Sequence, residues 1–398
     1  MPERLTGTLQ PYAWGSTTFI PDLLGEQPTG QPQAELWLGA HGSASSTLGD
    51  RSLDAVIAED PAGIVGTASV RAFGNGLPFL LKVLAAAKPL SLQAHPSREQ
   101  AEQGFAREQQ AGVSTDAGDR LYKDAWPKPE MLCALMDSEA LCGFRDPGET
   151  HGLFTRLGVG AATVLVAPLA DTRTPPAERL AGVFARLLRL QGSEREVVRE
   201  VAAAAATVVD GGELGLFART ARELGEHYDD DPGVLAALLL NRITLRLHEA
   251  VYLSAGNLHA YLSGGGVEIM ANSDNVIRGG LTAKRVDVDE LLDILDFTPA
   301  SPCYVQPVEI SPGCWHYPTS APEFALWRLE PRETSVEVPA SALARVLLVT
   351  DGSASRSVVG DGEDLQLRRG QSAFARAGEA LTVGGSGTVF VAGPGVDG

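Results

Sequence analysis

Cysteine and long apolar runs are both scarce in this chain. It has 398 residues and four cysteines, without the close spacing of a metal knuckle. Because small secreted domains depend on dense disulfides, we expect all four to be buried thiols in a reducing compartment: Cys133, Cys142, Cys303 and Cys314. No apolar run approaches the ~20 residues that a membrane-spanning helix needs, and the first residues do not resemble a signal peptide. These features predict a cytoplasmic protein without a membrane partner.

Positive charge is also in short supply. The chain has 32 basic and 50 acidic residues, which gives a net charge of −18. Such a chain repels phosphate backbones and anionic membrane surfaces, so nucleic acids and membranes are not its expected partners. A hydrophobic content of 44% is typical of a globular protein, and the length allows about two or three domains.

Lysine is rarer still, with five residues among the 32 basic ones. All five lie between residues 82 and 284, and four lie between 82 and 128: Lys82, Lys88, Lys123, Lys128 and Lys284. A lysine supplies a compact ammonium group, whereas arginine supplies a planar fork. The clustering supports a local positive pocket for an anionic substrate. Chance clustering among so few residues is the alternative.

The most informative stretch runs from residue 77 to residue 96. Its apolar first half, residues 77–84, predicts a strand that is buried on both faces. After a break at Lys88-Pro89, Ser91, Gln93 and His95 alternate with apolar residues and therefore share one face of a second strand. A capping box at Ser97 and Gln100 then predicts a helix over residues 98–110. A hydroxyl, an amide and an imidazole on one face predict a wall of a binding site.

A second candidate segment surrounds Glu130. Prolines flank Lys128, so the backbone there is extended, and Glu130 is the first charged residue of an apolar strand over residues 131–135. A carboxylate that leads a buried strand needs a partner. A metal ion and an arginine are both suitable partners.

The third segment covers residues 256–284. His259 and Tyr261 share one face of a strand, and a turn is predicted at residues 263–266. Four more polar residues follow in an apolar frame: Glu268, Asp274, Arg278 and Lys284. Beside His259 they predict another wall of the site, whereas an exposed turn with a surface arginine is the alternative.

The remaining sequence suggests a β protein with a helical insertion. Residues 1–76 predict strands and turns, and helical periods appear around residues 180–188, 194–209, 213–228 and 234–241. Strand patterns resume at Ile243, and the tail from about residue 321 is again β, with no histidine after His316. We therefore expect a catalytic domain over residues 1–148 and 242–320, a helical insertion over 149–241, and a structural C-terminal domain over 321–398.

The polar residues of the three segments could form one site. Two imidazoles, a carboxylate and an amide oxygen from Gln93, His95, Glu130 and His259 make a ligand set that suits zinc, with a position open to water. The ligands lie more than a hundred residues apart, so only the fold can assemble them.

The same segments resemble the type I phosphomannose isomerases of the cupin superfamily. The matching stretches read FLLKVLAAAKPLSLQAHP at 79–96, KPEMLCALMDSEALCGFR at 128–145 and GNLHAYLSGGGVEIMANSDNVIRGGLTAK at 256–284. Weaker matches are YAWG at 12–15, AELWLGAH at 34–41 and DPGVLAALLLN at 231–241. For the tryptophans in the first two of these, a place in the core and a place at the substrate are both open.

The resemblance implies a double jelly-roll fold with the helical insertion, and one zinc ion per chain held by Gln93, His95, Glu130 and His259. It implies interconversion of mannose 6-phosphate and fructose 6-phosphate through an enediol-type proton transfer, by a monomeric enzyme that serves GDP-mannose biosynthesis. Arg278 resembles the active-site arginine of the family. Glu268 and Asp274 are the candidate proton carriers, and Lys128 is a candidate helper. The candidate substrate contacts are Ser91, Lys82, Lys284 and Tyr261.

The chain departs from the family pattern at two predicted turns, around residues 247–250 and 263–266. His248 in the first of them is either an alternative metal ligand or an exposed turn residue. Two other functions compete. A cupin without catalysis would bind a sugar phosphate and leave it unchanged. An iron-dependent cupin oxygenase is disfavoured by the amide ligand and by the lysines.

Overall fold

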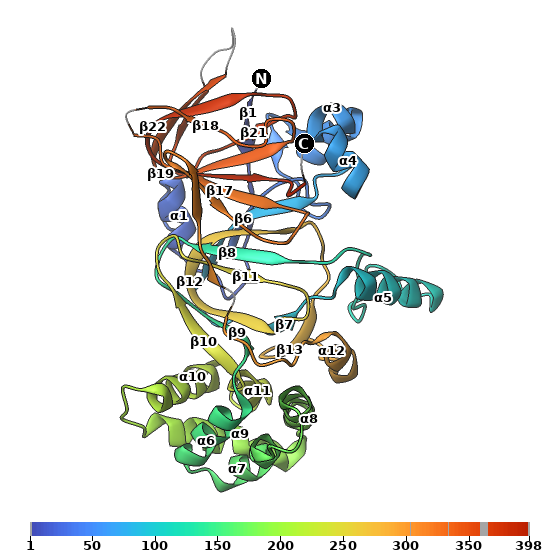
Figure 1. The fold of residues 1–398 in the computed structure, drawn as a ribbon, viewed down its shortest axis with the longest axis vertical. Coiled ribbons are helices and arrows are strands. Elements are labelled where there is room, and N and C mark those ends of the chain that lie inside the picture. The colour runs from blue at the N-terminus through green and yellow to red at the C-terminus, as the bar shows by residue number, and fades with distance from the viewer. Residues whose placement is uncertain (1, 303, 333, 359–364, 397–398) are drawn as a thin grey trace.

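The computed structural model describes residues 2–302, 304–332, 334–358 and 365–396. Figure 1 shows three tiers: one sheet formed mainly by C-terminal strands, a second sheet in the middle, and a bundle of helices at the far end. Both chain ends lie at the C-terminal sheet. Within the described ranges no helix has the length and apolar character needed to cross a bilayer.

The middle sheet, here called the site sheet, has eleven strands. Its main path runs β14 (Tyr304–Val305), β11 (Ala250–Leu253), β8 (Glu130–Ala134), β12 (His259–Ala271), β6 (Phe79–Ala86), β3 (Glu35–Leu38) and β2 (Thr8–Gln10). Four more strands branch from it: β7 (Leu92–Ala94), β9 (Ser138–Phe144), β10 (Leu240–Leu245) and β13 (Ile277–Gly280). Every residue of β6 is buried, as its unbroken apolar run predicts.

The other sheet, here called the terminal sheet, also has eleven strands. Its path is β15 (Val308–Ser311), β16 (Cys314–Tyr317), β17 (Ala325–Leu329), β22 (Leu381–Gly393), β19 (Arg345–Val358), β21 (Ser372–Ala375), β1 (Glu3–Thr6), β4 (Thr47–Leu48) and β5 (Arg51–Ser52), with β18 (Val336–Glu337) and β20 (Leu365–Arg368) at its sides. The predicted strands of the C-terminal tail are therefore confirmed. Three N-terminal strands complete this sheet, so the chain begins and ends in it.

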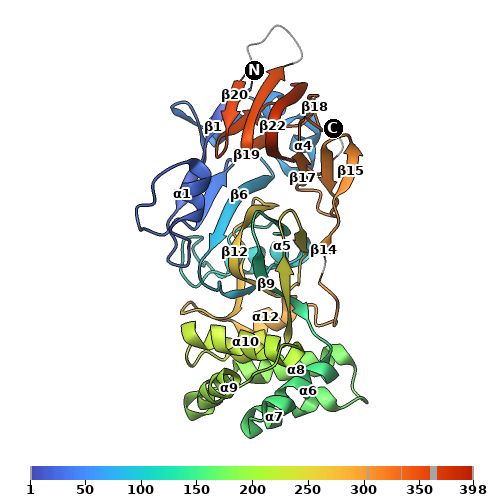
Figure 2. The ribbon, with the colours of Figure 1, turned by 90° about the vertical axis from the view of Figure 1, so that its left-hand side faces the viewer.

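Helices form the third tier, between β9 and β10. They are α6 (Pro147–Leu157), α7 (Gly160–Val166), α8 (Pro176–Leu188), α9 (Glu196–Ala206), α10 (Glu213–His227) and α11 (Gly233–Ala237). Figure 2 shows α12 (Val288–Ile294) between this bundle and the strands. Helices thus occupy the region predicted to be helical, but the last one is shorter than predicted: α11 ends at Ala237 and strand pairing with β9 begins at Leu240. The apolar run that continues past Ala237 suits a buried strand as well as a helix.

Helices and strands occupy similar shares of the chain, so the expected mainly β character is only partly confirmed. The N-terminal region accounts for much of the difference, because the prediction of strands and turns over residues 1–76 is wrong for four helices. These are α1 (Phe19–Leu24), α2 (Leu53–Glu59), α3 (Pro61–Val65) and α4 (Thr67–Phe73). Each has seven residues or fewer, too few for a helical period to be visible in sequence. The capped helix α5 (Arg98–Gln110) is confirmed, including the Ser97–Gln100 capping box.

Strand β12 organises the site sheet and corrects a second prediction. The expected turn at residues 263–266 is wrong, because β12 runs without interruption from His259 to Ala271. A register irregularity after Tyr261 and a left-handed φ of 109° at Gly264 mark a bulge in it. A side chain at Gly264 would lie 2.3 Å from the Ser138 hydroxyl of the neighbouring β9. Glycine is therefore required for close strand packing rather than for a chain reversal.

Apolar side chains from both sheets meet in one core cluster, which contains Leu81 and Val267 of the site sheet and Leu326 and Phe390 of the terminal sheet. A separate cluster joins the helical tier to β9, β12 and β13. Three of the four cysteines are buried, as expected; Cys303 lies outside the described residues.

Candidate active site

A cavity of about 480 Å³ opens on one face of the site sheet. Ten of the twelve residues singled out in the sequence line it: Lys82, Ser91, Gln93, Lys128, Glu130, Tyr261, Glu268, Asp274, Arg278 and Lys284. The other two, His95 and His259, are buried beside it, at 0% and 1% exposure. The fold thus brings together residues that span two hundred positions of the chain.

Strand register explains how the predicted metal ligands meet. His259, at the start of β12, pairs directly with Gln93 on β7. Near the other end of β12, Met270 pairs with Glu130 on β8. One long strand therefore lies beside both halves of the ligand set, and His95 follows at the end of β7.

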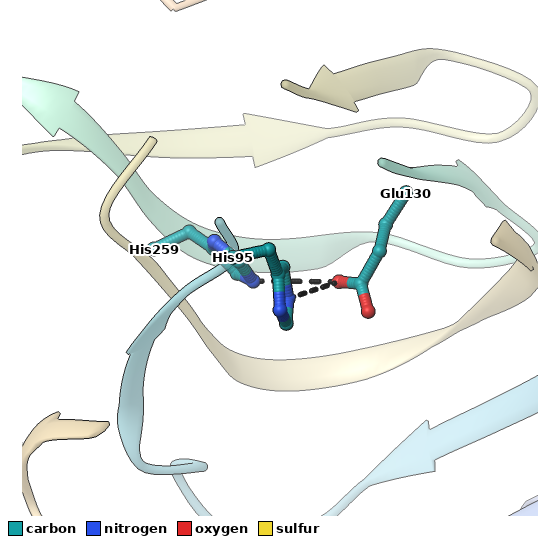
Figure 3. A group of neighbouring side chains, drawn as sticks. All are labelled: His95, Glu130 and His259. Atoms are coloured by element: carbon teal, nitrogen blue, oxygen red, sulfur yellow. Dashed lines mark ion pairs between the residues drawn. The ribbon is translucent and has the colours of Figure 1, made fainter. Parts of the chain in front are cut away.

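The two imidazoles and the carboxylate converge on one point, as Figure 3 shows. The Glu130 Oε2 atom lies 3.3 Å from His95 Nε2 and 3.4 Å from His259 Nε2. These donor atoms are mutually within 4.8 Å, and all three residues are buried. Gln93 completes the group, because its amide nitrogen lies 3.3 Å from His259 Nε2.

Backbone carbonyls determine which imidazole nitrogen is available. His95 Nδ1 lies 2.7 Å from the carbonyl oxygen of Asn275, and His259 Nδ1 lies 3.1 Å from that of Asn257. A carbonyl oxygen only accepts hydrogen bonds, so each Nδ1 carries the proton and each Nε2 presents a lone pair. Metal-binding histidines are usually oriented in this way by a second hydrogen bond.

The charge states also suit a cation. Burial lowers the pKa of His95 below its ordinary value, which favours the neutral ring that binds metals. Burial by itself would raise the pKa of Glu130, but His95 and Lys128 outweigh it, and the pKa of this carboxyl lies well below its usual value. Among the described residues, His95 Nε2 and Glu130 Oε2 have no hydrogen-bond partner. Two buried orphan atoms that face each other leave a site for a divalent ion.

This donor set fits zinc. Two histidines and a carboxylate are a common catalytic zinc combination, with the remaining positions open to water or substrate. A rotation of the Gln93 amide would offer its oxygen as a further ligand, because amide oxygen and nitrogen are exchanged by a half turn. The nearest cation to Glu130 is Lys128, at 3.1 Å, so the arginine considered from sequence is not its partner.

A second charged group lines the cavity next to the metal ligands. Lys82 Nζ lies 3.5 Å from Glu35 Oε1 and 3.3 Å from Glu268 Oε2. Lys82 pairs across the sheet with Glu268 on β12 and with Trp37 on β3, which brings these side chains together. The Lys82 ammonium also lies 5.3 Å from the centre of the Trp37 ring. Burial opposes the charge of Lys82, but Glu35 and Glu268 outweigh it and raise its pKa. Burial also raises the pKa of Glu268, against the effect of Lys82.

Arg278 and Lys284 are two further cations that line the cavity. Arg278 pairs with Gln93 across the β7–β13 ladder, so it lies close to the predicted metal ligands. Burial lowers the pKa of Arg278, and the charge of Arg278 then lowers the pKa of Lys284. No carboxylate in the described part of the chain offsets either charge. Two cations that repel each other at a cavity wall favour an anion between them.

Two further predicted residues have distinct environments. Asp274 is half-exposed and lies 3.3 Å from His41 Nε2, and the hydrogen bond to His41 lowers its pKa. Tyr261 is buried, and within the described chain its hydroxyl has no hydrogen-bond partner. Burial raises the pKa of Tyr261 well above its ordinary value, so the phenol stays neutral and able to donate.

Sequence patterns missed several cavity residues. Glu35, Trp37 and His41 come from the AELWLGAH segment, and Trp14 comes from YAWG. For Trp14 and Trp37, the core and the substrate site were both left open. The structure supports both, because the two tryptophans line the cavity and also pack against apolar side chains of neighbouring strands. Tyr228, from the helical insertion, also lines the cavity, although no site residue was predicted in that region. Its hydroxyl donates a hydrogen bond to the Pro89 carbonyl at 2.9 Å.

The structure also places the alternative ligand His248. It sits in a turn with a φ of 68°, and its ring lies 6.2 Å from that of Phe390 and 3.9 Å from the Glu330 carboxylate. Phe390 belongs to β22 of the terminal sheet, Glu330 directly follows β17, and His248 is absent from the metal-competent group. It is therefore a turn residue between the sheets.

Comparisons with known proteins find relatives that match nearly the whole chain. Residues 3–147 match the model of the type I phosphomannose isomerase catalytic domain. The mannose-6-phosphate isomerase of Escherichia coli (strain K12) is 39% identical over 396 residues, which cover 97% of each chain. A crystal structure of a phosphomannose isomerase variant from Salmonella typhimurium superimposes with a TM-score of 0.91 at 36% identity, over 99% of this chain and 100% of that one.

A zinc-bound mannose 6-phosphate isomerase superimposes with a TM-score of 0.90 at 35% identity, over 99% of this chain and 100% of that chain. The likeness therefore extends through all three tiers, well beyond the segments that carry the resemblance in sequence. On this basis the chain belongs to the type I phosphomannose isomerase family.

Proposed function

We propose that this chain is a zinc-dependent aldose–ketose isomerase that interconverts mannose 6-phosphate and fructose 6-phosphate. The observation that carries the proposal is the buried His95–Glu130–His259 group, whose donor atoms lack hydrogen-bond partners in the described chain. It lies next to a cavity that is also lined by the cations Arg278 and Lys284. Its relatives are named mannose-6-phosphate isomerases and include a zinc-bound structure. Gln93 is the fourth proposed ligand, and one zinc ion is expected per chain.

The reaction moves a proton between C1 and C2 of the open-chain sugar. Zinc held by these four residues would supply a Lewis acid for the sugar oxygens. The chain itself must supply a proton carrier, a group that stabilises negative charge on oxygen, and contacts that fix the sugar. We assign the stabilising role to Arg278, because it neighbours Gln93 across the ladder and has no competing carboxylate.

Glu268 is our choice for the proton carrier. A carrier works best when its pKa approaches the working pH, and burial shifts the pKa of Glu268 upward whereas His41 shifts that of Asp274 downward. Glu268 is also almost fully buried, at 2% exposure, which protects an abstracted proton from exchange with water. Asp274 with His41 would then act on a sugar hydroxyl, and Lys128 beside Glu130 would contact an oxygen near the metal.

We place the phosphate at the cavity wall that carries Lys284. Lys284 and Arg278 lack carboxylate partners in the described chain, whereas Lys82 already has two, so a dianion would relieve repulsion only at the former pair. We therefore assign Lys284 to the phosphate, with Ser91 beside it on the cavity wall, and Lys82 and Tyr261 to sugar hydroxyls. A phosphate held far from the reacting carbons fixes the sugar for the proton transfer.

The proposal includes the domain organisation and setting. We assign residues 1–148 and 242–320 to a catalytic cupin domain, 149–241 to the helical insertion, and 321–398 to a second jelly roll. The position of α6 to α11 between β9 and β10 supports the insertion. The pairing of β1 with the C-terminal strand β21, which also brings β4 and β5 into the terminal sheet, joins the two β domains. A cytoplasmic monomer is our expectation, and the buried thiols suit a reducing compartment.

A coupled assay on mannose 6-phosphate, with and without a chelator, tests the proposal. We expect turnover to fructose 6-phosphate that the chelator abolishes and that added zinc restores. Binding of mannose 6-phosphate without turnover would favour the catalytically silent cupin. Oxygen consumption that depends on iron would favour the oxygenase, and either result would refute the isomerase.

A further inference from the structure

The turn that carries Lys284 rests on the helical insertion. It comprises residues 279–284, which include the last two residues of β13 and the four that follow them, and is here called the lysine turn. Leu281 lies at its centre with a left-handed φ of 55° and is buried in the same apolar cluster as Val234 and Leu235 of α11. A branched side chain seldom adopts such a backbone, and the surrounding contacts must hold it there.

Asp231 supplies one of those contacts, just before α11. Its Oδ2 atom accepts a hydrogen bond from the Thr282 amide at 3.0 Å, and its Oδ1 atom accepts one from the Gly233 amide at 2.7 Å. The Thr282 hydroxyl in turn accepts a hydrogen bond from the Lys284 amide at 3.1 Å. A continuous set of bonds therefore runs from the insertion to the backbone of Lys284.

Two glycines supply the other contact. A side-chain carbon on Gly233 would lie 2.6 Å from the Leu281 nitrogen and 2.8 Å from the Gly280 Cα. A side-chain carbon on Gly280, whose φ is 119°, would lie 2.6 Å from the Gly233 Cα. The neighbouring atoms belong to backbone and cannot rotate away. The two backbones therefore touch, and only glycine fits on either side.

We propose that Asp231 and Gly233 are positioning residues, through which the helical insertion holds the lysine turn in the geometry that binds the substrate phosphate. Arg278 and Lys284 repel each other before the phosphate arrives, so a free turn would move the lysine away. Holding it in place beforehand removes that cost from substrate binding. The inference rests on the proposed phosphate site. It gives the insertion a role in substrate recognition, and it assigns a role to the DPG segment at residues 231–233.

Two variants of neighbouring aspartates test this role. Asp231→Ala removes the hydrogen bond to the Thr282 amide of the lysine turn and the one to the Gly233 amide of α11. Asp230→Ala removes a surface ion pair with Arg199 at 3.6 Å. For Asp231→Ala we expect a roughly tenfold higher KM for mannose 6-phosphate, the usual loss for one buried hydrogen bond to a charged group. The inhibition constant of inorganic phosphate should rise by the same factor, while kcat changes less and zinc content stays constant. Asp230→Ala should match the wild-type protein in all four values.

Thr282→Val provides a variant that keeps the shape of the turn and removes only the acceptor for the Lys284 amide. A smaller rise in the same two constants is expected, and it remains measurable if Asp231→Ala does not fold. A double variant completes the test: in a Lys284→Ala background, Asp231→Ala should add little, because its effect passes through that lysine.

Equal phosphate inhibition in Asp231→Ala and Asp230→Ala would overturn the inference, as would full additivity with Lys284→Ala. These results differ from a failure of the proposed function, in which the wild-type protein itself would not isomerise mannose 6-phosphate. In that case calorimetric titration with inorganic phosphate compares the same variants. A tenfold weaker affinity in Asp231→Ala would still support the positioning role, and an unchanged affinity would refute it.

Discussion

The two sheets of this protein have the same number of strands and share one apolar core, yet they treat buried charge differently. In the site sheet, buried lysines, glutamates and histidines face one another around a cavity. In the terminal sheet, Arg345 is fully buried but donates to the carbonyl oxygens of Arg376 and Glu379, at 3.2 and 2.7 Å. Burying a charge costs several kcal/mol even in a relaxed protein. Backbone carbonyls offset part of this cost for Arg345, although its Nε atom has no hydrogen-bond partner in the described chain. In the site sheet, by contrast, such buried atoms of His95 and Glu130 converge on one point.

The sharpest test of this contrast replaces one histidine in each sheet. His259→Ala removes a buried donor of the metal-competent group, so we expect loss of both bound zinc and isomerase activity. His316→Ala removes a half-buried ring that lies 5.6 Å from the Trp327 ring in the terminal sheet, and should change neither. Zinc content by elemental analysis and turnover on mannose 6-phosphate provide the measurement. A His259→Ala protein that is active without zinc would refute the ligand assignment.

A second pair of variants compares the half-buried Arg278 of the site sheet with the buried Arg345 of the terminal sheet. Arg278→Ala should lower kcat by roughly two to three orders of magnitude, the effect of losing a group that stabilises developing charge, while zinc stays bound. Arg345→Met should lower the melting temperature and leave kcat and KM of the folded enzyme unchanged, because Arg345 donates to backbone oxygens of the terminal sheet region and does not line the cavity. Near-normal turnover in Arg278→Ala would exclude this residue from the chemistry.

The smallest expected effect concerns His248, which lies between the sheets. Its amide donates to Ala134 of the site sheet, and its carbonyl accepts from the Tyr317 hydroxyl of the terminal sheet. Burial, with a contribution from Arg328, lowers the pKa of His248 from 6.5 to about 4. Between these two values the unfolded chain binds a proton that the folded chain does not, so stability is lost as the pH falls through this window.

His248→Asn keeps a residue that tolerates the left-handed backbone and removes the titration. Relative to this variant, the wild-type protein should lose roughly 1 kcal/mol of stability between pH 6.5 and pH 4, after allowance for solvent screening. Thermal unfolding over this pH range provides the measurement, and the exposed His227→Asn serves as control. Parallel pH profiles for wild type and His248→Asn would contradict the assignment.

The sequence was informative about the site because several of its polar residues alternate with apolar ones along a single strand. Period-two alternation placed Gln93 with His95 and His259 with Tyr261, and the structure brings both pairs to one cavity region. The same rule fails for Glu268, which lies nine positions after His259 and would face away along a regular strand. The bulge after Tyr261 reverses the alternation, so that Glu268 joins the cavity wall. The sequence showed only a run of glycines there, which is also typical of a turn.

Other cavity residues were missed because nothing in their neighbouring sequence marks them as part of a site. Glu35 and His41 stand out only through their partners, Lys82 and Asp274, which are distant in sequence. Tyr228 and Asp231 belong to the insertion, whose helical pattern carries no sign of the cavity beneath it.

The sequence by itself determined the residue types of a zinc site, the alternation that groups them, the presence of a helical insertion and the family. Tertiary structure decided which charges are paired, where β12 bulges, and that the insertion touches the lysine turn. The physical reason is the sequence separation over which each interaction acts. Hydrophobic periodicity and helix capping act over a few neighbouring residues. The partner of a buried charge and the packing of two backbones depend on segments that meet only in the folded chain.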